Sequence, residues 1–122
     1  MKTILVIDDE PDIVLMVELF LRFEGYHVVS AANGEAGLAA VQASSPDLVI
    51  VDWMMPVMDG VEFCQRLRRL PGFSATPVIM TTAAFDPIDI PGLWNVLLTK
   101  PVSLDVLVAR IQTLLGGGTP RP

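Results

Sequence analysis

The sequence contains almost no cysteine or histidine. Among its 122 residues, Cys64 is the single cysteine and His27 the single histidine. One cysteine excludes a disulfide framework and a cysteine-based zinc site. One histidine with no cysteine near it in the chain is no metal site either. The sequence therefore predicts neither a disulfide nor a metal site built on cysteine and histidine.

Long apolar runs and a surplus of basic residues are also missing. The longest apolar run, Ile13–Val17, has five residues and is too short to span a bilayer. The opening MKTILVIDDE reaches two acids too early for a secretory signal. Eight basic residues against 14 acidic ones give a net charge of −6, which argues against nucleic acid or an anionic membrane as a partner. We therefore expect a cytoplasmic domain.

Apolar residues, by contrast, make up 52% of the chain and are arranged in a regular alternation. Short apolar runs predict strands over residues 4–7, 26–31, 48–51, 77–80 and 96–98. Helical patterns lie between them, over residues 11–24, 35–43 and 60–70, and a last helix follows over residues 104–115. Apolar strands alternating with helices predict an α/β fold with a doubly wound parallel sheet. We expect one domain, residues 1–115, and a flexible Gly/Pro tail or linker, residues 116–122.

Two of these helices show in the sequence which face they bury. The first carries apolar residues at helical spacing: Ile13, Met16, Val17 and Phe20. The third is predicted to start at an Asp59 cap, to point Val61, Cys64 and Leu67 inward, and to point Arg66, Arg68 and Arg69 outward. Both patterns are typical of helices that cover a sheet.

Polar residues stand where the predicted strands end. Asp8 and Asp9 follow the first strand, Asp52 follows the third, Thr81 and Thr82 follow the fourth, and Thr99 and Lys100 follow the fifth. In a doubly wound sheet, ligands bind beyond the carboxyl ends of the strands. These side chains are therefore expected to converge on one edge.

Three carboxylates at one edge need positive charge. Two unit charges about 4 Å apart repel by roughly 4 kcal/mol at an effective dielectric constant of 20. Lys100 supplies one positive charge, so a hard divalent cation completes the site best, and Mg²⁺ suits a few carboxylates plus water. A carboxylate beside Mg²⁺ and a lysine is also placed to form an aspartyl phosphate.

Each of these residues also has a simpler interpretation. Asp9 or Glu10 could merely cap the helix that Pro11 starts. Thr81 and Thr82 could be ordinary strand-end threonines. Asp52 is harder to explain in this way, because no helix begins directly after it. The joint placement of these residues is what favours a functional site.

With these residues in view, the sequence resembles the receiver domain of two-component response regulators. The resemblance extends to about Leu115 and rests on four stretches in the family's order: ILVIDDEP, LVIVDWMMPVMDG, TTAA and LLTKPVS. It implies a flavodoxin-like sheet of five parallel strands in the order 2-1-3-4-5. It also implies a signalling domain rather than an enzyme, one that promotes its own phosphorylation and dephosphorylation.

Carried over position by position, the resemblance makes Asp52 the phosphoacceptor. Asp9 and Asp52 would ligate Mg²⁺ directly, and the backbone carbonyl of Met54 would add another oxygen. Asp8 would act on the ion through water. The phosphoryl donor would be a phosphohistidine on a sensor histidine kinase or a histidine phosphotransfer protein. A phosphorylation-linked dimer is a further expectation, and no contact with nucleic acid or membrane is expected of this domain.

The resemblance also assigns the groups that would meet the phosphoryl oxygens. Lys100 would pair with the acyl phosphate, and the Lys100–Pro101 peptide bond is expected to be cis. Thr82 rather than Thr81 aligns with the switch hydroxyl of the family, because Thr82 directly precedes the alanine.

Between Thr82 and Lys100 the sequence departs from the family. The segment AAFDPIDIPGLWNVLLT should hold a fourth helix, yet Pro91 would break a helix started at Pro87 and capped by Asp86. We therefore expect a shortened or irregular fourth helix. Leu97 replaces the tyrosine or phenylalanine that changes rotamer on activation in the family. Trp94 is expected to fill the core where the helix is missing.

Two positions bear on the lifetime of the phosphate. In the family, the residues two after the phosphoacceptor and two after the switch hydroxyl influence hydrolysis, and here they are Met54 and Ala84. Neither side chain can position an attacking water. The expectation is slow self-dephosphorylation.

Three other classes of protein compete with this interpretation. A haloacid-dehalogenase-type phosphatase would carry Asp-x-Asp after the first strand, where this chain has Asp8-Asp9-Glu10, and it would need room for a cap domain. In a flavodoxin-like cofactor binder, an acidic loop would repel the phosphate. The stronger rival is a degenerate receiver that acts as a constitutive interaction module without switching.

Overall fold

Strands and helices alternate along the chain in the computed structural model, which describes residues 1–85 and 87–116. The elements are β1 (Thr3–Ile7), α1 (Pro11–Phe23), β2 (His27–Ala31), α2 (Gly34–Ser44), β3 (Leu48–Asp52), α3 (Gly60–Arg69), β4 (Val78–Thr82), β5 (Val96–Thr99) and α4 (Leu104–Leu114). All neighbouring strands pair in parallel, in the order β2-β1-β3-β4-β5. The predicted flavodoxin-like fold is confirmed.

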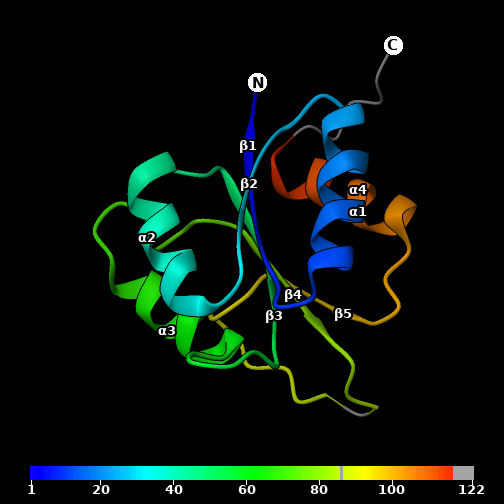
Figure 1. Cartoon of the computed structure of the whole chain (residues 1–122). Helices are drawn as coiled ribbons and strands as arrows, with labels where there is room; N and C mark the ends of the chain where they lie inside the picture. The colour runs from blue at the N-terminus through cyan, green and yellow to red at the C-terminus, as the bar shows by residue number, and fades with distance from the viewer. Residues whose placement is uncertain (86, 117–122) are drawn as a thin grey trace.

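The sheet is covered by helices on both faces, with α2 and α3 on one side and α1 and α4 on the other (Figure 1). Each face has its own core of buried residues. Val49 and Val51 of β3 lie in the core beneath α2 and α3, whereas Ile50 lies in the core beneath α1 and α4. This alternation is the two-residue period of a strand that is buried on both faces.

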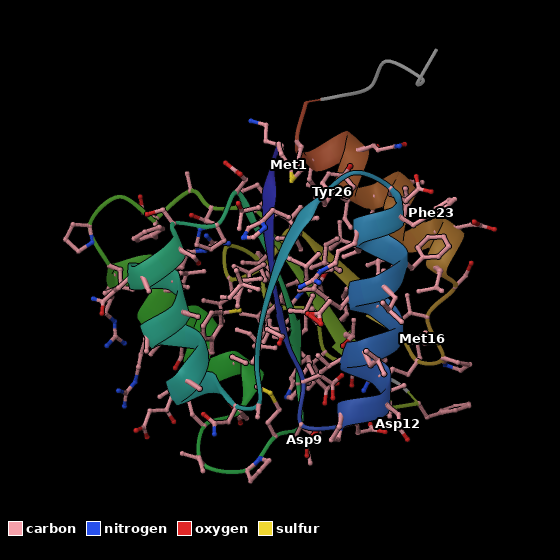
Figure 2. The ribbon with its side chains drawn as sticks, turned by 45° about the horizontal axis from the view of Figure 1, so that its top comes forward. Met1, Asp9, Asp12, Met16, Phe23 and Tyr26 are labelled. Carbon is pink, nitrogen blue, oxygen red and sulfur yellow. The ribbon has the colours of Figure 1, made fainter. Side chains whose placement is uncertain are left out.

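Helix α1 buries a narrower stripe than its sequence pattern predicts. Val17 and Leu21 are buried, whereas Met16 is 46% exposed. Phe23 at the end of the helix projects away from the sheet, as Figure 2 shows. The prediction of Met16 as a core residue was wrong and Leu21 was missed, because spacing alone does not settle which side of an apolar helix faces the sheet.

Helix α3 begins at the Asp59 cap, whose side chain accepts a hydrogen bond of 2.9 Å from the Glu62 N–H. Cys64 and Leu67 are fully buried, as predicted, and burial raises the pKa of the Cys64 thiol to about 12. The outward direction predicted for Arg68 was wrong. Its guanidinium donates to backbone carbonyls of the loop after α3, including that of Thr76 at 2.6 Å, and to that of Leu93 at 2.9 Å.

The stretch between β4 and β5, residues 83–95, is called here the β4–β5 segment. Its described residues, 83–85 and 87–95, form a turn at 91–93 and no helix. Asn95 ties its end to the sheet, because both its side chain and its backbone bond to the backbone of Val78. The expected loss of the fourth helix is confirmed, and the expected Asp86 cap lies outside the described residues.

Trp94 takes the place of the missing helix. Its side chain is 6% exposed and belongs to the core beneath α2 and α3. Its indole N–H donates a hydrogen bond of 2.6 Å to Asp89, and its ring lies 5.1 Å from the ring of Trp53 at an angle of 58°. The prediction that Trp94 fills the core is confirmed.

Among the described residues, no helix has the length and apolar character needed to cross a membrane. Helix α4 ends at Leu114, and Gly116 shortly after it has a φ of +72°, a backbone conformation that favours glycine. Residues 117–122, where the tail or linker was expected, lie outside the described residues.

Candidate functional site

The polar residues at the strand ends meet at one edge of the sheet. Asp9 lies at the end of the molecule opposite Met1, just before α1 (Figure 2). Register brings the neighbouring strand ends together, with Asp52 beside Thr81 and Thr82 beside Thr99. We call the charged group at this end, Asp8, Asp9, Glu10, Asp52 and Lys100, the acidic edge.

Lys100 lies at the centre of the acidic edge. Its Nζ is 3.1 Å from Asp8 Oδ2, 3.1 Å from Asp52 Oδ1 and 3.3 Å from Glu10 Oε1. Its backbone N–H donates to the carbonyl of Thr82 at 2.7 Å, and the Lys100–Pro101 peptide bond is cis. One ammonium group thus contacts carboxylates at the ends of two different strands, β1 and β3.

Burial and charge act against each other at Asp52. The residue is only 6% exposed, and burial raises the pKa of its carboxyl above the ordinary value, with the hydrogen bond from Lys100 offsetting part of the effect. Burial alone would lower the pKa of Lys100, but the hydrogen bonds to Asp52 and Asp8 outweigh it and hold that pKa above its usual range. The charged form of Lys100 is therefore stabilised, whereas burial disfavours the charged form of Asp52.

The acidic edge has room for more positive charge than Lys100 supplies. Carboxylate oxygens of Asp8, Asp9 and Glu10 all lie within 4.8 Å of one another. The Glu10 N–H donates to Asp8 Oδ1 at 2.9 Å, which orients the buried Asp8 carboxylate. Grouped carboxylate oxygens are the donors that Mg²⁺ prefers, so these residues fit such an ion.

Glu10 belongs to this group, although the only role that the sequence offered it, as an alternative, was a cap of α1. It is the N-cap residue of α1, yet its side chain makes no capping hydrogen bond and contacts Lys100 instead. A signal was present in the run of three successive acids after β1. The capping interpretation of Glu10 was wrong, because Lys100 from the far end of the chain offers a charged partner.

The two threonines at the end of β4 point to opposite faces of the sheet. Thr81 shares a face with Asp52, and its hydroxyl donates to Asp52 Oδ1 at 3.3 Å. Thr82 lies on the other face, where its hydroxyl accepts a hydrogen bond of 3.0 Å from the Ala84 N–H. Thr81 is therefore the threonine that contacts the Asp52 carboxylate, and the prediction that Thr82 meets a phosphoryl group stays a prediction.

The backbone after β3 approaches the site closely at Gly60. The Gly60 N–H donates to the carbonyl of Trp53 at 2.9 Å. A Cβ added at Gly60 would lie 2.5 Å from the Asp52 carbonyl oxygen, closer than such atoms pack. Glycine is therefore required for the loop that carries Met54 and then returns to start α3.

The remaining predicted positions surround the acidic edge without touching it. The Met54 side chain is 72% exposed, and Ala84 is exposed as well. Together with Thr82, Pro87 and Ile88 they line a shallow groove beside Trp53. Leu97 is half-buried and packs against the core beneath α2 and α3.

A second, largely apolar cavity of about 320 Å³ opens on the other side of Asp52's strand. Asp8, Glu10, Thr81 and Lys100 line one part of it, and apolar residues of β1, β3, α1, α4 and the loop before α4 line the rest. Thr81 thus lines this cavity and Thr82 lines the groove beside Trp53, so the two hydroxyls lie in different surroundings.

Comparison with known proteins gives one consistent family. The family model described as the response regulator receiver domain matches residues 4–112. The probable transcriptional regulator ycf27 of Cyanophora paradoxa is 45% identical over 118 residues, covering 93% of this chain and 48% of that protein. The chain spans about half the length of the curated relatives it matches.

Solved structures agree with this match. A putative response regulator from Chloroflexus aurantiacus superposes with a TM-score of 0.87 at 34% identity, covering 94% of this chain and 98% of that one. The response regulator TrrA from Thermotoga maritima, solved in complex with Mg²⁺ and BeF, has a TM-score of 0.84 at 31% identity, covering 93% and 99% of the two chains.

Proposed function

This chain belongs to the response regulator receiver domain family, and from that membership we propose that it accepts a phosphoryl group on Asp52. Receiver domains of two-component systems are signalling domains, not classical enzymes. We propose residues 1–115 as the unit that accepts the group.

One observation carries the proposal: Lys100 joins Asp52 to Asp8 across the edge of the sheet. Its Nζ lies 3.1 Å from both carboxylates. An ammonium group held there would neutralise oxygens of a phosphoryl group on Asp52. The carboxylate itself is at the carboxyl end of a central strand, where ligands of such sheets bind.

We assign Mg²⁺ to the acidic edge. Asp9 and Asp52 would hold it directly, Asp8 through water, and the Met54 carbonyl would add one more oxygen. The carboxylate oxygens of Asp8, Asp9 and Glu10 within 4.8 Å of one another support a hard cation at this edge, and the Thermotoga relative was solved in complex with Mg²⁺ and BeF. When bound, the ion supplies positive charge beside the phosphoryl oxygens.

Thr82 is proposed as the hydroxyl that meets the phosphoryl group and, with Leu97, marks the switch positions. The Thr82 hydroxyl accepts a hydrogen bond from the Ala84 N–H, which leaves its own proton free to donate to a phosphoryl oxygen. Leu97 is half-buried and packs on the apolar core, and its side chain has no polar group that could form a hydrogen bond.

The phosphoryl donor is proposed to be a phosphohistidine of a sensor histidine kinase or a histidine phosphotransfer protein, which places the domain in the cytoplasm. Several relatives are named as transcriptional regulators, and the chain covers about half of their length. Any DNA contact of a longer protein would then come from another domain. Pairing of two phosphorylated copies is a further part of the proposal.

The test is incorporation of one phosphoryl group. The full chain is incubated with Mg²⁺ and acetyl phosphate, and intact mass is measured for the wild type, Asp52→Asn and Asp105→Asn. Asp105 is an exposed acid at the start of α4 and serves as the matched control. We expect a gain of one group in the wild type and in Asp105→Asn, and none in Asp52→Asn.

A second candidate is a constitutive interaction module that does not switch. The irregular β4–β5 segment and Leu97 favour it, because both alter the surface through which receivers signal. Absence of any Asp52-dependent gain in mass would support this module and contradict the phosphoacceptor.

The metal is tested by its effect on tryptophan fluorescence. Trp53 adjoins Asp52 and its ring packs 5.1 Å from that of Trp94, so ion binding should change the emission. We expect a saturable change with Mg²⁺ that is lost in Asp9→Asn and kept in Asp12→Asn, which removes the same charge from the first turn of α1. Equal titrations in both variants would contradict the site.

A further inference from the structure

The hydroxyl of Thr81 contacts the carboxylate that the proposed function makes the phosphoacceptor. Thr81 Oγ1 donates to Asp52 Oδ1 at 3.3 Å, and Lys100 Nζ reaches the same oxygen at 3.1 Å. Both side chains are buried, Thr81 and Asp52 each being 6% exposed. Two donors from two strands therefore hold one oxygen of a nearly enclosed carboxylate.

This contact follows from the register of the sheet. Asp52 pairs with Thr81 across β3 and β4, and paired residues of parallel strands share a face. Ile50 and Ile79, each two residues earlier, lie in the core beneath α1 and α4. Met80 lies in the opposite core, and the same alternation carries Thr82 to that side. A hydroxyl at position 82 cannot replace the one at position 81.

The two carboxylate oxygens of Asp52 are thus left in different surroundings. Oδ1 accepts from Thr81 and from Lys100. For Oδ2, residues 1–85 and 87–116 provide no hydrogen bond. A carboxylate held at one oxygen by two donors has its rotamer restricted, which pre-orients the other oxygen for reaction.

We propose that Thr81 is a positioning residue for phosphoryl transfer, whose hydroxyl holds Asp52 Oδ1 beside Lys100 and leaves Oδ2 to accept the phosphoryl group. This inference rests on the proposed function. With acetyl phosphate, Oδ2 supplies an electron pair to phosphorus and forms the new P–O bond. The bond from phosphorus to the acetate oxygen breaks, and its electron pair leaves with acetate. Thr81 keeps its proton and acts only through Asp52.

The experiment compares rates of Asp52 phosphorylation by acetyl phosphate at saturating Mg²⁺, followed by intact mass. Thr81→Val keeps the shape of the side chain and removes the hydroxyl. Thr81→Ser keeps the hydroxyl and removes the methyl group. Thr99→Val makes the same change at the exposed end of β5 and is the matched control.

Loss of one hydrogen bond to the acceptor should slow Thr81→Val by about three- to tenfold. Thr81→Ser should restore a rate near that of the wild type, and Thr99→Val should react as the wild type does. A rate in Thr81→Val equal to the wild type would overturn the inference. So would a rate in Thr81→Ser as low as in Thr81→Val, since that would assign the effect to packing of the methyl group.

Two further outcomes remain decisive. If Thr81→Val does not fold, as judged by circular dichroism, Thr81→Ala and Thr81→Ser form the comparison, and the serine variant must react faster. Equal rates for those two would overturn the inference. Failure of the wild type to incorporate phosphate would overturn the proposed function itself and this role with it, whereas a reactive wild type with unaffected Thr81 variants would overturn the role of Thr81 alone.

Discussion

The β4–β5 segment leaves the sheet near the acidic edge and returns to it beside Val78, the first residue of β4, and the two regions are built differently. The acidic edge consists of charged side chains at or just after the ends of three strands, and Lys100 joins them with contacts of 3.1 to 3.3 Å. The β4–β5 segment has no helix in its described residues and depends on Trp94, Asn95 and the clamp from Arg68.

The difference lies in what holds each region in place. Strand pairing over several residues determines where Asp52 and Thr81 stand, so the site is supported by the whole sheet. The segment is held by one buried aromatic ring and a few hydrogen bonds, so loss of any one of them should disturb it more than loss of one contact disturbs the acidic edge. The geometry of the acidic edge can thus stay intact beside a segment that has lost its helix in the described residues.

The largest effect is expected from removing the ring that fills the core of the segment. Trp94→Ala should lower the free energy of unfolding by about 3 to 5 kcal/mol, because it leaves a cavity beneath the segment. Chemical denaturation measures this loss. Well below its melting temperature, the variant should still incorporate phosphate on Asp52. Loss of incorporation in the folded variant would show that the two regions are not independent.

A smaller effect is expected on the lifetime of the phosphate. Met54 is exposed beside the site and offers no polar group to an attacking water. Met54→Asn should speed loss of the phosphoryl group about tenfold, the worth of one added hydrogen bond to the water. The measurement is the decay of the phosphorylated mass after the donor is removed. Met54→Leu is the control and should decay as the wild type does.

The carboxylate of Asp52 should itself reduce the stability of the metal-free protein. Burial raises its pKa in the folded state, so the folded protein binds the proton more tightly than the unfolded chain. Stability should therefore rise as pH falls through the folded pKa and decline as pH rises through it. Asp52→Asn, measured in EDTA at neutral pH, should gain about 1 kcal/mol. A loss of stability would mean that the pair with Lys100 outweighs the burial of the charge.

The smallest effect is expected at the exposed part of the segment. Phe85 is fully exposed. Phe85→Ser should change the free energy of unfolding by less than about 0.5 kcal/mol, because the ring buries nothing. Chemical denaturation of Phe85→Ser and Trp94→Ala under the same conditions compares an exposed and a buried residue of one segment. If Phe85→Ser lowered the free energy of unfolding as much as Trp94→Ala does, Phe85 would have to be buried, which would contradict the structure of this segment.

Much of this arrangement could be read from the sequence. The apolar runs of two strands end near Asp52 and Lys100, and parallel strands bring their carboxyl ends to one edge, so those residues were predictable. Pro91 excluded a full helix, and Trp94 was the largest apolar side chain of the segment that could fill the gap. These predictions depend on chain direction and on local backbone chemistry, which sequence carries directly.

Other residues could not be assigned in this way. The sequence offered Glu10 no role beyond a possible cap, and it predicted that Arg68 points to solvent, because their partners Lys100 and Leu93 are distant in the chain. Thr81 and Thr82 are adjacent and identical, so no local pattern separates them. Their difference depends on which face of the sheet each side chain occupies.

The sequence by itself determined the order of strands and helices, the carboxylates that follow β1 and β3, and the loss of a helix before β5. These features follow from apolar periodicity, from the position of acids after strands and from the geometry of proline. Tertiary structure alone decided that Thr81 donates to Asp52 and that Lys100 joins Asp8, Glu10 and Asp52. The physical reason is that strand register and side-chain direction arise only when segments far apart in the chain pack together.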